Sequence, residues 1–243
     1  MSNYKYPTPQ LLLKAICDTI RAKTGSNDKI AHQDIPDELD SIIAKEEECE
    51  IAARELSNII YGSEVKVLDS KYILNIARYK FYGSDLTTID LPKCTSIGDS
   101  AFMDCTSLTT VNLPECTSIG EYAFKYCTNL TTIDLPECSS IGNAAFMDCI
   151  SLTTIDLPEC TSIESAFNNC ASLTTIILSN NQVVTLEKYA FNNTPISSGT
   201  GYIYVPDNLV DSYKTVTNWS TYANQIKPIS ELPSNLKEEY GYD

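Results

Sequence analysis

The sequence contains few of the residues on which catalytic sites depend. Its 243 residues include one histidine, His32, and only 9 glycines. A Ser-His-Asp or Cys-His site needs an imidazole beside its nucleophile, and His32 stands in a polar connector, so no such site can be assembled inside the repeats described below. No glycine-rich phosphate loop is present either. We therefore predict a protein that is not an enzyme and that needs no cofactor.

Positive charge and long apolar runs are also scarce. The 17 Lys and Arg residues face 32 Asp and Glu residues, and the net charge of −15 argues against binding to nucleic acid or to an anionic membrane surface. No apolar run approaches the length of a membrane-spanning helix. The opening "MSNYKYPTPQLLLKAICDTIRAK" has an apolar run cut by Lys14 and lacks a small-residue cleavage site, so it predicts no secretory signal.

Cysteine, in contrast, is frequent and regularly spaced. There are 10 cysteines, and between Cys94 and Cys160 one occurs every eleven residues. This spacing is half of a 22-residue repeat, which is clearest in four copies, the last of them one residue shorter. A fifth copy at 171–194 lacks the cysteines, a degenerate one precedes them at 73–84, and "GYIYVP" (201–206) predicts one more strand. The four copies are "SDLTTIDLPKCTSIGDSAFMDC" (84–105), "TSLTTVNLPECTSIGEYAFKYC" (106–127), "TNLTTIDLPECSSIGNAAFMDC" (128–149) and "ISLTTIDLPECTSIESAFNNC" (150–170).

Each copy predicts the same structural unit. The segment L-T-T-I-D-L-P alternates apolar and polar residues, which is typical of a short strand whose apolar side chains, such as Leu108 and Val111, face a core. The segment S-I-G-x-x-A-F then places Ile119, Ala123 and Phe124 at i, i+4 and i+5, which predicts one helical or 3₁₀ turn with a buried side. A unit this small cannot cover its own apolar face, but stacked units with parallel strands can. The sequence therefore predicts an α/β solenoid.

The cysteines of the repeats fall into two columns of the predicted stack. A zinc site needs closely spaced cysteine pairs, and the sequence has none. Disulfides within a column are the alternative, because neighbouring Cα atoms about 4.8 Å apart lie inside the permitted range. Stacked side chains point in parallel, however, and a disulfide needs its Cβ atoms closer, at about 3.8 Å. We expect buried, reduced thiols, and the same for Cys17 and Cys49 outside the repeats. The columns are Cys94, Cys116, Cys138, Cys160 and Cys105, Cys127, Cys149, Cys170.

The repeats resemble a known superfamily. Leu108, Val111 and Leu113 match the L-x-x-L-x-L pattern of leucine-rich repeats, and Cys116 stands near the family's Asn/Cys position. The longer pattern L-x-x-I-x-L-P…S-I-G-x-x-A-F-x-x-C resembles the BspA-like (Treponema-type) bacterial class over about residues 63–206. This resemblance implies parallel strands on a concave face, and a C-terminal cap that covers the last repeat. The cap residues would be Leu209, Tyr213, Trp219, Tyr222 and Ile226.

Residues 1–61 form a different, helical region in this prediction. Pro9 and Gly25 bound a first helix, and a second runs from Pro36 to Tyr61. The second helix carries an apolar stripe with nearly a 3-4 spacing, which either docks on the first repeat as a cap or joins copies of the chain into a homo-oligomer, a trimer or a dimer. The stripe consists of Leu39, Ile42, Cys49, Ala53, Leu56 and Ile60.

Part of this region also resembles the helical opening of tail and other virion proteins of phages and prophages of Gram-positive bacteria. The resemblance covers residues 11–42 and implies a virion component that assembles with other virion proteins, in the virion or in the bacterial cytoplasm during assembly. The residues that match are Ile20, Arg21, Lys23, Thr24, Gly25, Asp34, Ile35 and Pro36.

The acidic residues are concentrated in the repeats. Residues 84–170 carry 2 basic and 12 acidic side chains, a net charge of −10. One acidic column and a threonine column are expected on the solvent side of the strands, and Glu115, Glu137 and Glu159 form a second acidic column. These acids are either a solvated surface or a binding face for a cationic partner, Ca²⁺, a protein or a glycan; a glycosidase would also need a cleft. We call the expected concave surface the strand-face strip: Thr88, Asp90, Thr110, Asn112, Thr132, Asp134, Thr154 and Asp156.

The sequence as a whole predicts a non-enzymatic solenoid that either binds a ligand or forms part of a larger assembly. Its expected parts are a helical assembly or capping region at 1–61, a degenerate first repeat at 62–83, leucine-rich repeats at 84–206, and a cap and tail at 207–243. The leading interpretation is a phage or prophage virion component that presents the repeats outward. The alternative is a BspA-like surface adhesin or host-interaction protein, located outside the cell.

Overall fold

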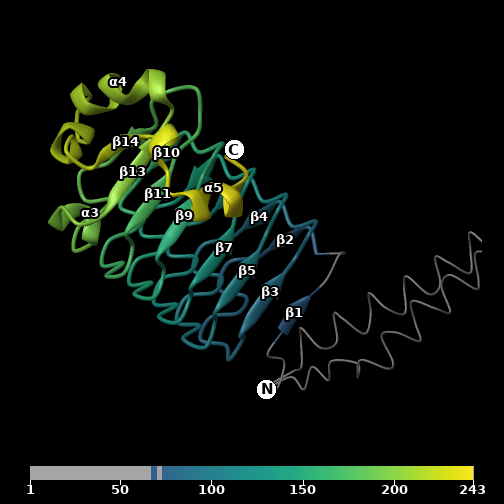
Figure 1. Cartoon of the computed structure of the whole chain (residues 1–243). Coiled ribbons are helices and arrows are strands. Elements are labelled where there is room, and N and C mark those ends of the chain that lie inside the picture. Colours follow the sequence, from purple (N-terminus) through teal and green to yellow (C-terminus); the bar gives the residue numbers. More distant parts are fainter. Residues whose placement is uncertain (1–66, 70–72, 243) are drawn as a thin grey trace, which may run out of the picture. The chain divides into compact units, whose positions relative to one another are not determined.

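The structure is a computed structural model of the chain, and it describes residues 67–69 and 73–242 (Figure 1). In these residues, each repeat forms one turn of a solenoid, as predicted, and every turn contributes one strand of three or four residues and most turns a second strand of two. Each three-residue strand lies in the T-I-D segment of its repeat, with its middle side chain buried. Ile89, for example, is fully buried.

The longer strands form two parallel four-stranded sheets. The register keeps equivalent residues of successive repeats side by side, so that Thr88 pairs with Thr110 and Asp90 with Asn112. Because β7 and β9 also lie next to each other, the two sheets present one outer face, which we call the strand face (Figure 1). The first sheet has the order β1 (Val67–Asp69), β3 (Thr88–Asp90), β5 (Thr110–Asn112), β7 (Thr132–Asp134). The second has the order β14 (Ile226–Pro228), β13 (Tyr202–Val205), β11 (Thr175–Ile177), β9 (Thr154–Asp156).

The S-I-G-x-x-A-F segment differs from its prediction. Ser118 and Ile119 form a two-residue strand that pairs in parallel with its neighbours, and turns rather than a helical turn follow it. The predicted burial of Ile119, Ala123 and Phe124 is nevertheless confirmed, because both arrangements place these side chains inward. These strands form a third sheet in the order β12 (Thr185–Leu186), β10 (Ser162–Ile163), β8 (Ser140–Ile141), β6 (Ser118–Ile119), β4 (Ser96–Ile97), β2 (Asn75–Ile76).

The glycine of this segment permits the close stacking of successive turns. A Cβ atom built on Gly120 would lie 2.6 Å from the backbone nitrogen of Asp99, and one on Gly142 would lie 2.8 Å from that of Glu121. Real Cβ atoms do not approach backbone so closely, so a side chain here would push two turns apart. The fourth copy has no such glycine. It has lost one residue between Ile163 and Ala166, and its shortened turn still places Phe167 on Phe146.

Phenylalanine rings form one continuous column through the core. The predicted members are Phe102, Phe124, Phe146 and Phe167, all fully buried, with successive ring centroids 5.3 to 5.5 Å apart and nearly parallel planes. The column extends one ring further at each end, to Phe81 and Phe191. Offset stacking of this kind adds to the free energy gained by burying the rings.

The eight cysteines of the repeats are buried and free, as expected. Their thiols also satisfy backbone carbonyl groups. The Cys127 thiol donates to the Phe102 carbonyl at 3.2 Å, and the Cys149 thiol donates to the Phe124 carbonyl at the same distance. In the other column, the Cys116 thiol lies 3.4 Å from the Ser118 carbonyl. Cysteine therefore acts here as a small apolar side chain that can donate one weak hydrogen bond.

The C-terminal cap covers the last turn of the solenoid as predicted. Tyr213 and Trp219 are fully buried, and the Trp219 ring lies 6.0 Å from that of Phe191 at the end of the column. The Trp219 indole donates to the Val184 carbonyl at 2.6 Å. Tyr222 and Ile226 are buried, whereas Leu209 is only partly buried. The cap region contains α3 (Pro195–Ser198), η1 (Asp207–Leu209), α4 (Val210–Thr215) and η2 (Trp219–Tyr222).

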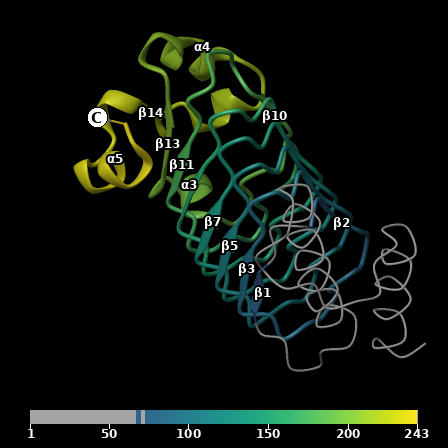
Figure 2. The same cartoon turned by 90° about the vertical axis from the view of Figure 1, so that its right-hand side faces the viewer.

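After the cap, the chain returns to the strand face. The returning segment, residues 229–242, is called the tail below, and it contains η3 (Ile229–Glu231) and α5 (Ser234–Tyr240). Figure 2 shows α5 outside β11 and β13, with β10 of the third sheet on the opposite side of these strands. No pattern in the sequence predicts this return.

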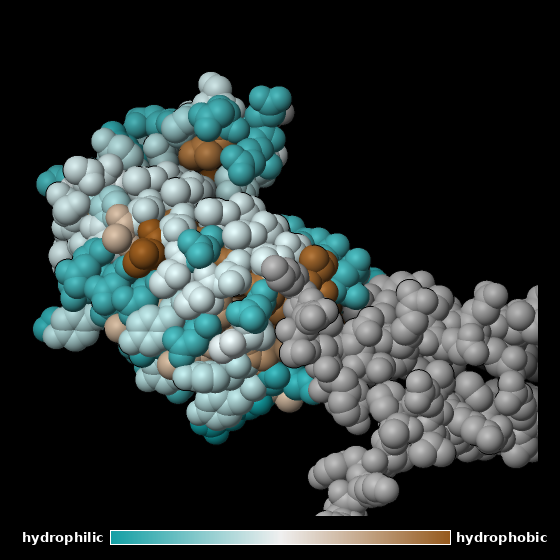
Figure 3. All heavy atoms as spheres, turned by 90° about the horizontal axis from the view of Figure 1, so that it is seen from below, coloured by the Kyte–Doolittle hydropathy of each residue, from teal (hydrophilic) through white to brown (hydrophobic). Residues whose placement is uncertain are grey.

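The described surface is mixed in character. Figure 3 shows one face on which hydrophobic side chains of the described residues stand mostly singly among hydrophilic ones. Among these residues, no helix has the length and hydropathy that a bilayer crossing requires. The predicted N-terminal helices, their apolar stripe, and Cys17 and Cys49 lie outside the described residues, and the proposed domain boundaries stay predictions.

Candidate functional site

The strand-face strip consists of two rows that run across the strands. The first residues of the strands form a threonine row, in which Thr88 pairs with Thr110 and Thr110 with Thr132. The third residues form a row of carboxylates interrupted by one amide. Because the strands are parallel and in register, equivalent side chains of neighbouring strands stand about 4.8 Å apart. The predicted strip therefore exists as a geometric array, although its role in binding stays a prediction.

The carboxylate row is not uniform along its length. The Asn112 side-chain amide donates to Asp90 Oδ1 at 2.7 Å, which joins the first two repeats of the row. Asp134 on the next strand is exposed, although neighbouring groups displace part of the water around its carboxylate and so raise its pKa. Its side chain stands beside Asn112, which bears no charge. The amide thus separates two carboxylates that would otherwise repel each other.

Asp156, which was expected to face water, is only partly exposed, because the tail contacts its carboxylate. Tyr242 of the tail donates its hydroxyl to Asp156 Oδ1 at 2.9 Å and lies 3.1 Å from Oδ2. Removal from water raises the pKa of Asp156 to about 6, against the opposing effect of the Tyr242 hydrogen bond. Burial disfavours the charged form of a carboxylate, and the raised pKa reflects this free-energy cost. The tail therefore covers one end of the predicted strip.

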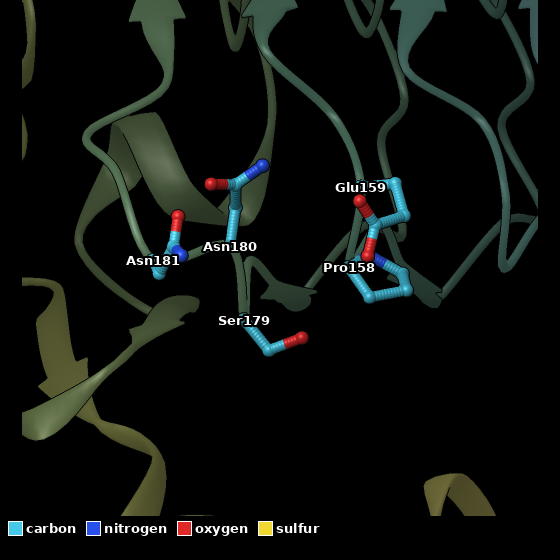
Figure 4. Close-up of a pocket in the computed structure, with 5 residues that line it drawn as sticks. All are labelled: Pro158, Glu159, Ser179, Asn180 and Asn181. Atoms are coloured by element: carbon cyan, nitrogen blue, oxygen red, sulfur yellow. The ribbon is translucent and has the colours of Figure 1, made fainter.

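The second acidic column is also varied. In the first of the four clear copies its position is taken by Lys93, which forms an ion pair with Glu115 of the next copy. Glu159 lines a pocket of about 250 Å³ together with Pro158, Ser179, Asn180 and Asn181. Figure 4 shows Pro158 and Glu159 on one side of this opening and the three residues of the fifth copy on the other.

The pocket arises where the repeat pattern changes. The fifth copy replaces the P-E-C segment with S-N-N, and the Asn180 side chain donates to the Cys160 carbonyl at 3.4 Å and accepts from the Gln182 backbone at 2.9 Å. Asn180 is thus held by its neighbours. Ser179 connects the pocket to the tail, because its hydroxyl lies 2.9 Å from that of Tyr242.

Among the described residues, neither a cluster of metal-ligating side chains nor an activated thiol is found. Within residues 67–69 and 73–242, no group of three or more His, Cys, Asp or Glu side chains is arranged to hold a metal ion. Burial raises the pKa of the Cys116 and Cys138 thiols to about 12 and that of Cys160 to about 11. Thiols of this kind are poor nucleophiles at neutral pH, because the reactive thiolate is scarce.

The stacked parallel strands, the repeat length and the buried cysteine columns together define a leucine-rich-repeat solenoid. The sequence profile of the BspA-type leucine-rich repeat region matches the chain at residues 18–115 and 74–197. The chain therefore belongs to the BspA-type leucine-rich repeat family. Proteins with leucine-rich repeats are generally binding or structural proteins. The first match begins within the predicted N-terminal region. The virion-like pattern at residues 11–42 has no further support.

Solved structures of bacterial leucine-rich repeat proteins are similar to the chain. A leucine-rich cell surface protein from Faecalibacterium prausnitzii A2-165 is 26% identical, with a TM-score of 0.44, over 63% of this chain and 42% of its own. The T. pallidum leucine-rich repeat protein is 24% identical, with a TM-score of 0.48, over 69% and 86%. A leucine-rich repeat protein from Bacteroides ovatus ATCC 8483 is 21% identical, with a TM-score of 0.43, over 69% and 46%.

The chain thus spans less than half the length of the Faecalibacterium and Bacteroides chains. No curated protein matches it.

Proposed function

We propose that this chain is a non-enzymatic binding protein of a bacterial surface, and that the open part of the strand-face strip takes a cationic protein segment. The observation that carries the proposal is the in-register row of acceptors at Asp90, Asn112 and Asp134, flanked by the threonine row. Membership of the BspA-type family supports a binding role. It favours the surface-protein alternative over the virion interpretation.

The chemistry of the row fits a basic ligand. Ionised carboxylates only accept hydrogen bonds, and the Asn112 amide nitrogen is already engaged with Asp90. An extended peptide lying across the strands would meet an acceptor roughly every 4.8 Å, which arginine and lysine side chains can satisfy. A cationic ligand would also offset the negative charge of the repeats, so its binding should weaken as salt is added.

The test compares two double variants of the full-length protein with equal changes in charge. Asp90→Lys with Asp134→Lys reverses the open strip, whereas Glu121→Lys with Glu187→Lys reverses two exposed acids outside it. The probe is a fluorescein-labelled peptide of ten alternating arginine and serine residues, measured by fluorescence anisotropy at about 0.15 M salt. We expect the strip variant to lose at least tenfold in affinity and the control less than twofold.

Two other outcomes would contradict the cationic-ligand proposal. Equal losses in both variants would mean that the probe reads only net charge and that the strip is a solvated surface. No peptide binding by the unmodified protein, together with strip-dependent binding on an array of glycans, would make the ligand a glycan.

The virion role is a second candidate, and the pattern at residues 11–42 is the observation that favours it. Mass spectrometry of purified particles after prophage induction, together with the cell-wall fraction of the same culture, separates the two. Under the proposal, the protein is found in the cell-wall fraction and is absent from particles. Enrichment in particles would reverse the ranking.

A further inference from the structure

The tail is seated on the strand face through one buried side chain. Leu232 is 3% exposed and forms a cluster with Ile177 of β11 and Tyr204 of β13. Ile229, Leu236, Tyr240 and Tyr242 pack partly buried against the same cluster. The contact therefore combines an aliphatic anchor with aromatic side chains around it.

A polar contact at the end of the tail fixes its position along the strip. The Tyr242 hydroxyl lies within 2.9 Å of both Asp156 Oδ1 and Ser179 Oγ. These partners come from two successive repeats, so the hydroxyl marks one site on the face. A hydrogen bond to a carboxylate is among the stronger ones, and removal of the hydroxyl would leave Asp156 partly buried without this donor.

The strand face changes in character where the tail covers it. The third-residue row is polar from Asp69 to Asp156, and then continues in register through Ile177, Tyr204 and Lys227. Aliphatic and aromatic side chains thus replace carboxylates in the last repeats. An outward-facing Ile177 and Tyr204 would be exposed if the tail were removed, and exposed apolar clusters on repeat proteins are typical of binding surfaces.

The tail itself has little independent structure. The helix α5 has seven residues, none of them buried, and an isolated helix of this length is unstable in water. Two further contacts hold the start of the tail, from the Ser230 backbone to Asp207 at 3.1 Å and between Lys227 and Glu231 at 3.3 Å. Both involve exposed groups, which contribute little. Most of the docking free energy therefore comes from the apolar packing centred on Leu232 and from the hydrogen bonds of Tyr242.

We propose that the apolar end of the strand face is a peptide-docking site that the chain's own tail occupies, and that it accepts a partner peptide of the same chemistry. The partner segment carries an aliphatic side chain for the Ile177–Tyr204 cluster and, about ten residues later, a tyrosine for Asp156. It binds by displacing the tail. This inference deepens the proposed binding function and rests on it, but it concerns the end of the strip opposite to Asp90.

The experiment offers the tail as a separate molecule to full-length variants. The probe is a fluorescein-labelled peptide with the sequence of residues 229–243. Leu232→Asp, which removes the anchor of the attached tail, should bind this peptide at least tenfold more tightly than the unmodified protein. Glu238→Ala, a change at an exposed tail position, should behave like the unmodified protein. Trypsin should also cleave at Lys237 faster in Leu232→Asp.

A second set of changes locates the bound peptide. Replacing the final tyrosine of the peptide, equivalent to Tyr242, with phenylalanine should weaken binding to the Leu232→Asp protein about tenfold, because a hydrogen bond to a carboxylate is lost. Adding Asp156→Asn to the protein should weaken it to a similar extent, whereas adding Asp85→Asn, an exposed control, should not.

Several outcomes would overturn the inference. One is a Leu232→Asp protein with native circular dichroism that does not bind the peptide, and another is equal binding by the unmodified protein. If Leu232→Asp fails to fold, Tyr242→Phe decides: it should bind the peptide more tightly than the unmodified protein, and unchanged binding rejects the docking site. None of these results depends on the arginine peptide, so failure of the cationic strip and failure of the tail site are distinguishable.

Discussion

Replacing Phe124 with alanine tests whether the ring column carries the stability of the solenoid. Phe124 is fully buried, and its ring lies 5.3 Å from that of Phe102 and 5.5 Å from that of Phe146. A buried phenylalanine removes roughly 150–250 Å² from water, worth about 4–6 kcal/mol at about 25 cal/mol per Å². Alanine retains part of this area, so we expect the free energy of unfolding to fall by about 3–5 kcal/mol.

The matched control is the same change at the end of the column. Phe81 is only partly buried and has one described ring neighbour in the column, Phe102, at 5.3 Å. Phe81→Ala should therefore cost about 1–2 kcal/mol, measured in the same urea titration. In a stacked array, damage at Phe124 should also spread to both neighbouring repeats, visible as faster hydrogen exchange on each side. A loss below about 1 kcal/mol for Phe124→Ala, or equal losses for the two variants, would refute the reasoning.

Four further predictions concern other parts of the chain. The ten cysteines should all react with a thiol reagent after unfolding without reductant, and those of the repeats should react slowly in the folded protein; a count of eight or fewer contradicts the reduced state. Gly142→Ala should lower the free energy of unfolding by about 1–3 kcal/mol, because its Cβ would clash with the backbone of Glu121. Ala144→Gly, at a φ of 52°, should change it by less than about 1 kcal/mol, because relief of backbone strain offsets the lost methyl group. Because the pKa of Asp156 is raised to about 6 in the folded state, the folded state holds the proton more tightly than the unfolded state does. The free energy of unfolding should therefore fall, by an amount on the order of 1–3 kcal/mol, as pH rises from about 4 to about 7. Asp156→Asn should remove this pH dependence. Light scattering should find a homo-oligomer for the full chain and a monomer for residues 62–243, and a full-length monomer at tens of micromolar would leave the N-terminal stripe as a cap.

Much of the solenoid can be predicted from the sequence because its signal is repeated. Five copies share the alternation around Val111 and the position of Phe124, so chance patterns in one copy are averaged out. The second strand was missed because two residues are too few to show a period, and the spacing of Ile119, Ala123 and Phe124 also fits a helical turn. The structure resolves this ambiguity through hydrogen bonds to the neighbouring turn, such as that from Gly120 N to Ile97 O at 2.8 Å.

The tail and the thiol hydrogen bonds could not be predicted in this way. Tyr242 and Asp156 are separated by 86 positions, and the tail has no counterpart in the repeats, so no periodic signal links the two. The thiol donors were missed for a different reason. The regular spacing of Cys127 and Cys149 shows that cysteine is favoured at each turn, but which backbone carbonyl it meets depends on the turn conformation. The roles assigned to the strip and to the N-terminal stripe stay predictions.

The junction between copies has a consequence for how this surface can change in size. Each clear copy ends in a buried cysteine whose thiol donates to a backbone carbonyl of the preceding turn. Each copy also begins with the same kind of short segment, which leads into a strand. Removing residues 106–127 would join Cys105 to Thr128, and this junction matches the native one between Cys127 and Thr128. The chain can therefore gain or lose whole turns without a new kind of contact, and the reach of its strand face is set by the number of copies rather than by the design of any one of them.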